Sequence, residues 1–244
     1  MFLLGFMNQL PATLSEKDRP AIDALSSDQL WQDCQETIKR SIGLFEQAGY
    51  DLEVEDYHFT ILLGNPEKAM LQLNKDYSGD GGIPGYLMLS LLPNDYTLPR
   101  VQAALAHECN HNVRFQFIKW NQQTTLADWV VSEGLAESFA AELYGKVLIG
   151  PWVTSISPEQ LEEIKRIISS QIQLTEMAEM APYLYGDEIA KVQGQIPVGM
   201  PYAAGYAYGY HLIQDYLKRT GKSIIEATVT PTEEILEATK DFWK

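Results

Sequence analysis

The chain has 244 residues, 45% of them hydrophobic and 11% aromatic, so it is long enough to bury a sizeable core within one domain. Its formal net charge of −15 argues against a nucleic-acid partner, which needs a basic face, and against binding to an anionic membrane surface. Two cysteines cannot build a disulfide framework, and no stretch is long and apolar enough to span a bilayer.

The N-terminal end has an apolar run at residues 1–7 that is too short for a leader and lacks a basic segment before it. We therefore expect a start segment that packs on the body of the protein, and a cytoplasmic location. Residues 16–48 predict one or two helices, with an N-cap at Ser26-Ser27-Asp28. Residues 54–64 predict a strand, within which His58 is expected to be structural.

A short helix is predicted to begin at Asn65-Pro66-Glu67, because proline is favoured at the first helical position. Residues 78–82 predict a turn-rich loop, since three of these five residues are glycine. Residues 85–92 then predict an apolar strand.

From residue 98 onward the pattern is helical. A break is expected at residues 150–152, and the less regular stretch 176–199 predicts either a wall or lid over a cleft or a rigid connector. The predicted helices are 98–120, 126–144, one opened by Ser157-Pro158, 202–219 and 232–243. We expect one domain over residues 1–244, with an N-terminal portion at 1–80 and a catalytic portion at 81–221.

The most informative motif is His107-Glu108-Cys109-Asn110-His111. Residues four apart lie one above the other on a helix, so His107 and His111 present two imidazoles to one point. Glu108 lies about 100° around the same helix. This HExxH arrangement is typical of zinc sites in which two histidines bind the metal and the glutamate is the general base.

A second motif supplies the third protein ligand that a catalytic zinc usually takes. Glu133 and Glu137 lie one turn apart in an otherwise apolar stretch, so one can bind the metal while the other orients a histidine. Cys109 faces away from the histidines and is expected to be a small buried hydrophobe, and Cys34 has no zinc or redox spacing to it. We expect Arg114 either to steady a carboxylate near the site or to form a surface salt bridge.

Three segments together resemble a known family: HECNHNVRF at 107–115, VSEGLAESFA at 131–140 and GYAYGYHLIQDYL at 205–217. The first two resemble the gluzincin metallopeptidases, and all three resemble the DUF2268 family of predicted zinc-dependent proteases, over about residues 81–221. The resemblance implies an α+β, zincin-like fold, mostly helical with a small mixed sheet before the HExxH helix.

The resemblance also implies roles for single residues. Glu133 would be the third ligand of one zinc ion, with Glu137 in place of the aspartate that many gluzincins use to orient a histidine; an exchange of these two roles stays open. The strand at 85–92 would be the sheet edge that aligns an extended peptide, or else a buried core strand. Peptides or proteins are the implied substrates, and the negative charge favours neutral or basic ones.

Peptide hydrolysis also needs a donor to the oxyanion of the transition state. Tyr202, Tyr206 and Tyr210 recur every fourth residue and predict a phenol stripe along one helical face. Tyr206 is the preferred donor and His211 the alternative, while aromatic core packing is an equal expectation for any single tyrosine.

Overall fold

The computed structural model describes residues 14–154 and 156–243; the apolar run at 1–7 lies outside them. The chain divides into two compact units, with the division between Asn112 and Val113 inside helix α5 (Val101–Phe117). The prediction of one domain over residues 1–244 stays a prediction. No helix within the described ranges has the length and apolar character needed to cross a membrane.

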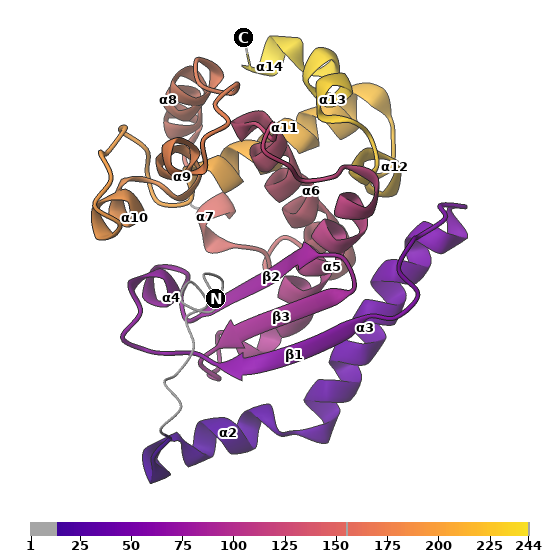
Figure 1. Cartoon of the computed structure of the whole chain (residues 1–244), viewed down its shortest axis with the longest axis vertical. Helices are drawn as coiled ribbons and strands as arrows, with labels where there is room; N and C mark the ends of the chain where they lie inside the picture. The colour runs from indigo at the N-terminus through magenta and orange to yellow at the C-terminus, as the bar shows by residue number, and fades with distance from the viewer. Residues whose placement is uncertain (1–13, 155, 244) are drawn as a thin grey trace. The chain divides into compact units, whose positions relative to one another are not determined.

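The N-terminal unit contains a three-stranded mixed sheet, as predicted (Figure 1). Its strands are β1 (His58–Leu63), β2 (Tyr77–Ile83) and β3 (Tyr86–Leu91), in the order β1-β3-β2. β1 runs parallel to β3, and β2 runs antiparallel to it with an irregular register between Asp80 and Ile83. Leu87, Leu89 and Leu91 alternate along β3 and are buried, which makes this strand the apolar centre of the sheet.

One prediction about this sheet is wrong: residues 78–82 are not a loop but most of strand β2, because their glycines allow close approach to a helix, as described below. Of the two alternatives for the strand at 85–92, the buried core strand is confirmed and the sheet edge is excluded, since β3 pairs on both sides; β1 and β2 are the edge strands. The order of strands depends on long-range pairing, which the alternation along one strand does not encode.

The helices of this unit are α2 (Arg19–Leu25), α3 (Asp28–Gln47), α4 (Ala69–Leu73) and the first turns of α5, with short 3-10 turns at Glu16–Asp18 and Leu98–Arg100. Helix α3 begins after Ser27, as predicted, although the Ser27 side chain makes no capping bond. Its buried residues Cys34, Ile38, Ile42 and Phe45 follow helical spacing and form one apolar face. Pro66 lies in a turn ahead of α4 instead of opening the helix, so that predicted start is wrong.

The C-terminal unit is helical. Its elements after α5 are α6 (Leu126–Tyr144), α7 (Pro151–Thr154), α8 (Pro158–Ser169), α9 (Met177–Tyr185), α10 (Asp187–Val192), α11 (Ala204–Thr220), α12 (Ile224–Thr228), α13 (Thr232–Ala238) and α14 (Lys240–Trp243). The bounds of α6 are those predicted, and α8 begins at the predicted Ser157-Pro158 with a capping box to Gln160. The stretch at 176–199 is mostly helical, because α9 and α10 occupy it.

Helices α6 and α11 pack together at two glycines. A Cβ on Gly134 would lie 2.1 Å from the carbonyl oxygen of Gly209, and a Cβ on Gly209 would lie 2.2 Å from that of Val130. Only glycine permits this approach of two helix backbones. The crossing fixes the turn of α6 that carries Glu133.

Candidate metal centre

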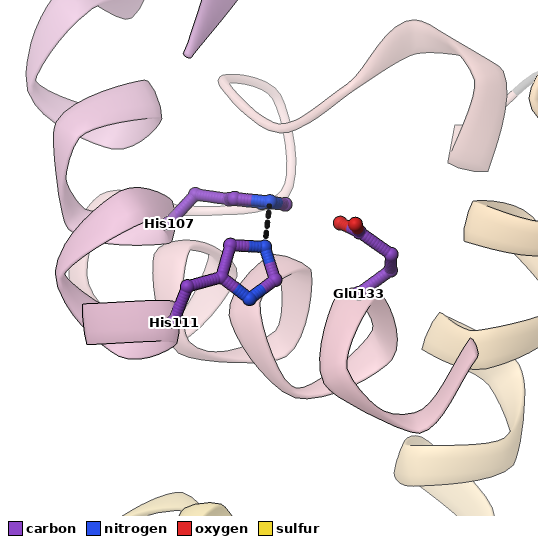
Figure 2. A group of neighbouring side chains, drawn as sticks. All are labelled: His107, His111 and Glu133. Atoms are coloured by element: carbon purple, nitrogen blue, oxygen red, sulfur yellow. Dashed lines mark hydrogen bonds between the residues drawn. The ribbon is translucent and has the colours of Figure 1, made fainter. Parts of the chain in front are cut away.

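Two imidazoles of α5 point at one another in the N-terminal unit. His107 and His111 lie one helical turn apart, and their Nε2 atoms are 3.1 Å from each other (Figure 2). The two rings meet edge to face, with their centroids 4.8 Å apart. The HExxH spacing therefore does bring both ring nitrogens to one point, as the sequence predicts.

Glu133 on α6 completes a group of three possible ligands. One atom from each of His107, His111 and Glu133 lies within 4.8 Å of the other two (Figure 2). Two imidazole nitrogens and one carboxylate oxygen are a donor set that zinc prefers in catalytic sites. His111 and Glu133 are each only 7% exposed, and low access to water strengthens the attraction between such ligands and a cation. The residues present thus fit a zinc ion.

Glu108 lies against the glycines of strand β2. A Cβ on Gly79 would be 2.2 Å from Glu108 Oε1, and a Cβ on Gly81 would be 2.1 Å from the Glu108 carbonyl oxygen. The glycines at 79 and 81 are therefore required by the contact with α5, and they leave room for the buried Glu108 side chain.

Asn112 ties the β2–β3 hairpin to α5. Its Oδ1 accepts a hydrogen bond from the Gly85 N–H at 2.7 Å. Its amide nitrogen lies 3.0, 2.8 and 2.9 Å from the carbonyl oxygens of Gly81, Ile83 and Tyr86. Asn112 is fully buried and one residue beyond His111, so the same turn of helix holds a possible ligand and the strand that covers Glu108.

Glu133 and Glu137, the two candidate ligands on α6, each accept a hydrogen bond from a tryptophan. Trp129 Nε1 donates to Glu133 Oε1 at 3.2 Å, and Trp152 Nε1 donates to Glu137 Oε1 at 3.1 Å. Glu137 Oε2 also accepts from the Gly150 N–H at 3.3 Å. Both oxygens of Glu137 thus have protein donors in the segment after α6; its predicted role in orienting a histidine stays a prediction.

A row of aromatic rings joins these two tryptophans in the C-terminal unit. The aromatic row consists, in order of contact, of Trp129, Tyr185, Tyr206, Trp152 and Tyr202, with centroid separations of 5.7, 6.2, 5.9 and 6.2 Å. Tyr206, the predicted oxyanion donor, lies in the middle of it. All five rings are partly exposed, so none is enclosed in the core.

The predicted phenol stripe is wrong at its first member. Helix α11 begins at Ala204, and the left-handed backbone of Ala203 (φ 50°) separates Tyr202 from it. Burial is the main reason that the pKa of Tyr202 is raised, with Tyr185 and Glu188 adding to the shift. Tyr210 belongs to a buried apolar cluster with Ile149 and Val153, which is core packing.

His211, the alternative donor, lies on another face of α11. It is five residues beyond Tyr206 and therefore about 140° around the helix. The half-buried His211 ring has a lowered pKa, chiefly because of burial and secondly because of Lys165 and Lys146. Its role, like that of Tyr206, stays a prediction.

The remaining singled-out residues are structural. Cys109 is fully buried, as predicted, and burial raises its thiol pKa. His58 begins β1 and stacks on Tyr86, with the ring centroids 5.4 Å apart. Neither expectation for Arg114 holds: it is fully buried and donates to Ser132 Oγ, to the Thr228 and Thr230 carbonyls and to Thr232 Oγ1. Desolvation lowers its pKa to about 10.

Three contributors to the site are absent from the sequence prediction: Trp129, Asn112 and the glycines of β2. The contact of Trp129 with Glu133 can be predicted from the sequence, because Trp129 lies one turn before Glu133 on a predicted helix. The contacts of Asn112 and Gly79 span about thirty residues and have no local pattern.

An HExxH helix with a carboxylate on the next helix, in a mostly helical α+β chain, defines a candidate zinc-binding protein. The chain belongs to the family described as "Predicted Zn-dependent protease (DUF2268)", whose profile matches residues 30–237. It is 35% identical over 227 residues to the "Uncharacterized protein YjfC" of Bacillus subtilis (strain 168), covering 93% of this chain and 74% of that protein. It is 27% identical over 155 residues to "Uncharacterized protein YjaZ" of the same organism, covering 62% of this chain and 55% of YjaZ. No solved structure matches the chain.

Proposed function

We propose that the chain is a zinc-dependent peptidase in which His107, His111 and Glu133 hold one zinc ion on a zincin-like scaffold. The observation that carries the proposal is the approach of their ligand atoms to within 4.8 Å, with Glu108 on the same helix. A bound zinc ion would polarise the scissile carbonyl and lower the pKa of water beside it. The family description supports the metal and the reaction class.

Glu133 is favoured over Glu137 as the third ligand because hydrogen bonds hold Glu137 in place. Both oxygens of Glu137 accept hydrogen bonds, from Gly150 and Trp152, and Glu133 is the carboxylate in the group with His107 and His111. Moving Glu137 onto a metal would give up two hydrogen bonds of a buried carboxylate, which costs about 1.5–3 kcal/mol for each.

Glu108 would accept a proton from the attacking water and return it to the leaving amine. Its side chain is confined by Gly79 and by its own place on α5, so it needs little reorganisation during the reaction. Tyr206 would donate its phenol O–H to the developing oxyanion, with His211 as the alternative donor. The substrates would be peptides or proteins, with neutral or basic sequences favoured by the charge of −15, and no nucleic acid or membrane partner is proposed.

The deciding experiment measures zinc content and hydrolysis of a fluorogenic peptide library with Glu108→Gln beside wild type. The variant should keep about one zinc per chain and lose about 10²–10⁴-fold in turnover, because it removes the general base alone. Glu142→Gln, the same change at an exposed position of α6, is the matched control and should be unaffected. Equal turnover in both variants and wild type would refute the proposed role of Glu108.

The ligand set is tested in the same preparation. His107→Ala and Glu133→Ala should each lose zinc, whereas Glu137→Ala should retain it. Loss of zinc with Glu137→Ala but not with Glu133→Ala would exchange the two roles. Wild-type protein that holds zinc but hydrolyses no peptide would favour a non-catalytic zinc-binding protein on the same scaffold.

A further inference from the structure

The contact between Trp129 and Glu133 has features beyond a surface hydrogen bond. Trp129 lies four residues before Glu133 on α6, and its indole N–H reaches one carboxylate oxygen, Oε1, at 3.2 Å. Glu133 as a whole residue is 7% exposed, so water competes weakly for that oxygen. An indole N–H is a donor without an acceptor, so it cannot itself take up a metal ion.

The indole ring of Trp129 is fixed by two aromatic neighbours in the same unit. Trp120 meets it at 90° with 5.6 Å between centroids, and Tyr185 meets it at 89° with 5.7 Å. These two edge-to-face contacts restrict the plane of the ring and hence the direction of its N–H. The donor is therefore positioned before any ligand binds, and the carboxylate adapts to it.

A carboxylate can bind a metal through one oxygen or two, and the number decides how many positions remain for water and substrate. Resting on the proposed function, we propose that Trp129 is a positioning residue that holds Glu133 Oε1, so that Glu133 offers the zinc a single oxygen, Oε2. Because the indole is neutral, Trp129 and Glu133 together keep the net charge of the carboxylate, which attracts a cation. A lysine or arginine at position 129 would cancel that net charge.

The test measures zinc affinity by competition with a chromophoric chelator, for wild type, Trp129→Phe and Trp31→Phe. Trp129→Phe keeps an aromatic ring but removes the N–H, and its zinc affinity should fall about 10–100-fold, the usual effect of losing a group that orients a ligand. Trp31→Phe makes the same change in an indole whose N–H donates to the Leu25 carbonyl and whose ring contacts Phe59, and it should keep wild-type affinity.

Cobalt substitution gives a readout that loss of packing alone would not change. If Oε1 is released, Glu133 can bind through both oxygens, and the visible absorption of the cobalt protein should weaken, as it does when four-coordinate cobalt becomes five-coordinate. Benzothienylalanine at position 129 keeps the size of the ring and replaces N–H by sulfur, so it serves if Trp129→Phe does not fold. It should show the same loss of affinity and the same spectral change.

Wild-type affinity and an unchanged cobalt spectrum in the Trp129 variants would overturn the positioning role while leaving the peptidase proposal intact. If the wild-type protein binds zinc but cleaves no peptide, the peptidase proposal is refuted. Weaker zinc binding by Trp129→Phe would then still support the positioning role. Wild-type protein that binds no zinc would refute both.

Discussion

The contact of strand β2 with Glu108 predicts opposite outcomes for neighbouring glycines. In Gly79→Ala, the new Cβ would lie 2.2 Å from Glu108 Oε1, about 1.2 Å short of ordinary contact at 3.4 Å. The obstacle is the Glu108 side chain, whose Cδ and Cγ would also lie at 2.6 and 2.7 Å, so the whole side chain must change its rotamer while the backbone of α5 keeps its place. Displacement of a catalytic group by about 1 Å costs about 10²-fold in rate. Turnover should fall by this factor, with zinc content unchanged.

In Gly81→Ala, the new Cβ would meet the backbone of α5 instead, at 2.1 Å from the Glu108 carbonyl oxygen and 2.9 Å from its Cα. The main-chain atoms of a helix cannot relieve this clash by changing a rotamer, so the free energy of unfolding should fall by about 1–3 kcal/mol or more. In a chain of this size, each kcal/mol lowers the melting temperature by about 2–4 °C.

Gly82→Ala is the control within the same strand, because its Cβ would meet only Asp80 Oδ1, at 3.3 Å. Peptide hydrolysis and thermal unfolding, monitored by circular dichroism, separate the three variants. The reasoning would be refuted by a Gly79→Ala protein as active as Gly82→Ala, or by a Gly81→Ala protein that unfolds at the same temperature as Gly82→Ala.

Three further predictions concern single side chains. Arg114→Met should lower the free energy of unfolding by about 3 kcal/mol in urea titrations, because it leaves the buried carbonyls of Thr228 and Thr230 without their donor; a change below about 1 kcal/mol would contradict this. Burial raises the pKa of Cys34 to about 11 and that of Cys109 still further, so neither thiol should react with a disulfide reagent at pH 8 until urea unfolds the chain; rapid reaction of the folded protein would be inconsistent with this burial. Tyr206→Phe should reduce peptide turnover about 10²–10³-fold with zinc content intact, and unchanged turnover would remove Tyr206 as the oxyanion donor.

The helices that carry the candidate ligands could be predicted because their signals are local. His107 and His111 bring two imidazoles together only if their segment is a helix, and the apolar residues around Glu133 predict a helix with the bounds that α6 has. The start of α8 at Ser157-Pro158 is likewise encoded in adjacent residues.

The errors at strand β2, at the sheet edge and at Arg114 share a physical cause, which is that the deciding contact lies far away in the sequence. Glycines at 79, 81 and 82 are typical of a turn, but Gly79 and Gly81 lie against Glu108 of α5, whose side chain and backbone leave no room for a Cβ at these two positions. Arg114 looks like a surface cation, yet four oxygens of α6 and of the α12–α13 region compensate its burial. Strand order depends on which strands pair, and every apolar strand has the same alternation.

The hydrogen bonds of Asn112 have a consequence for how this hairpin tolerates sequence change. The Asn112 side chain binds main-chain groups of the hairpin, namely one N–H and three carbonyls between Gly81 and Tyr86. The side chains of the turn, including the half-exposed Ile83, can therefore vary while the backbone keeps its path, whereas Gly81 is restricted by the backbone of α5 and Gly85 by its φ of 86°. Aspartate, although nearly the same shape as asparagine, would present oxygen to three carbonyls. A relative or a designed variant can thus acquire a new surface at this hairpin without giving up its attachment to the helix that bears the histidines.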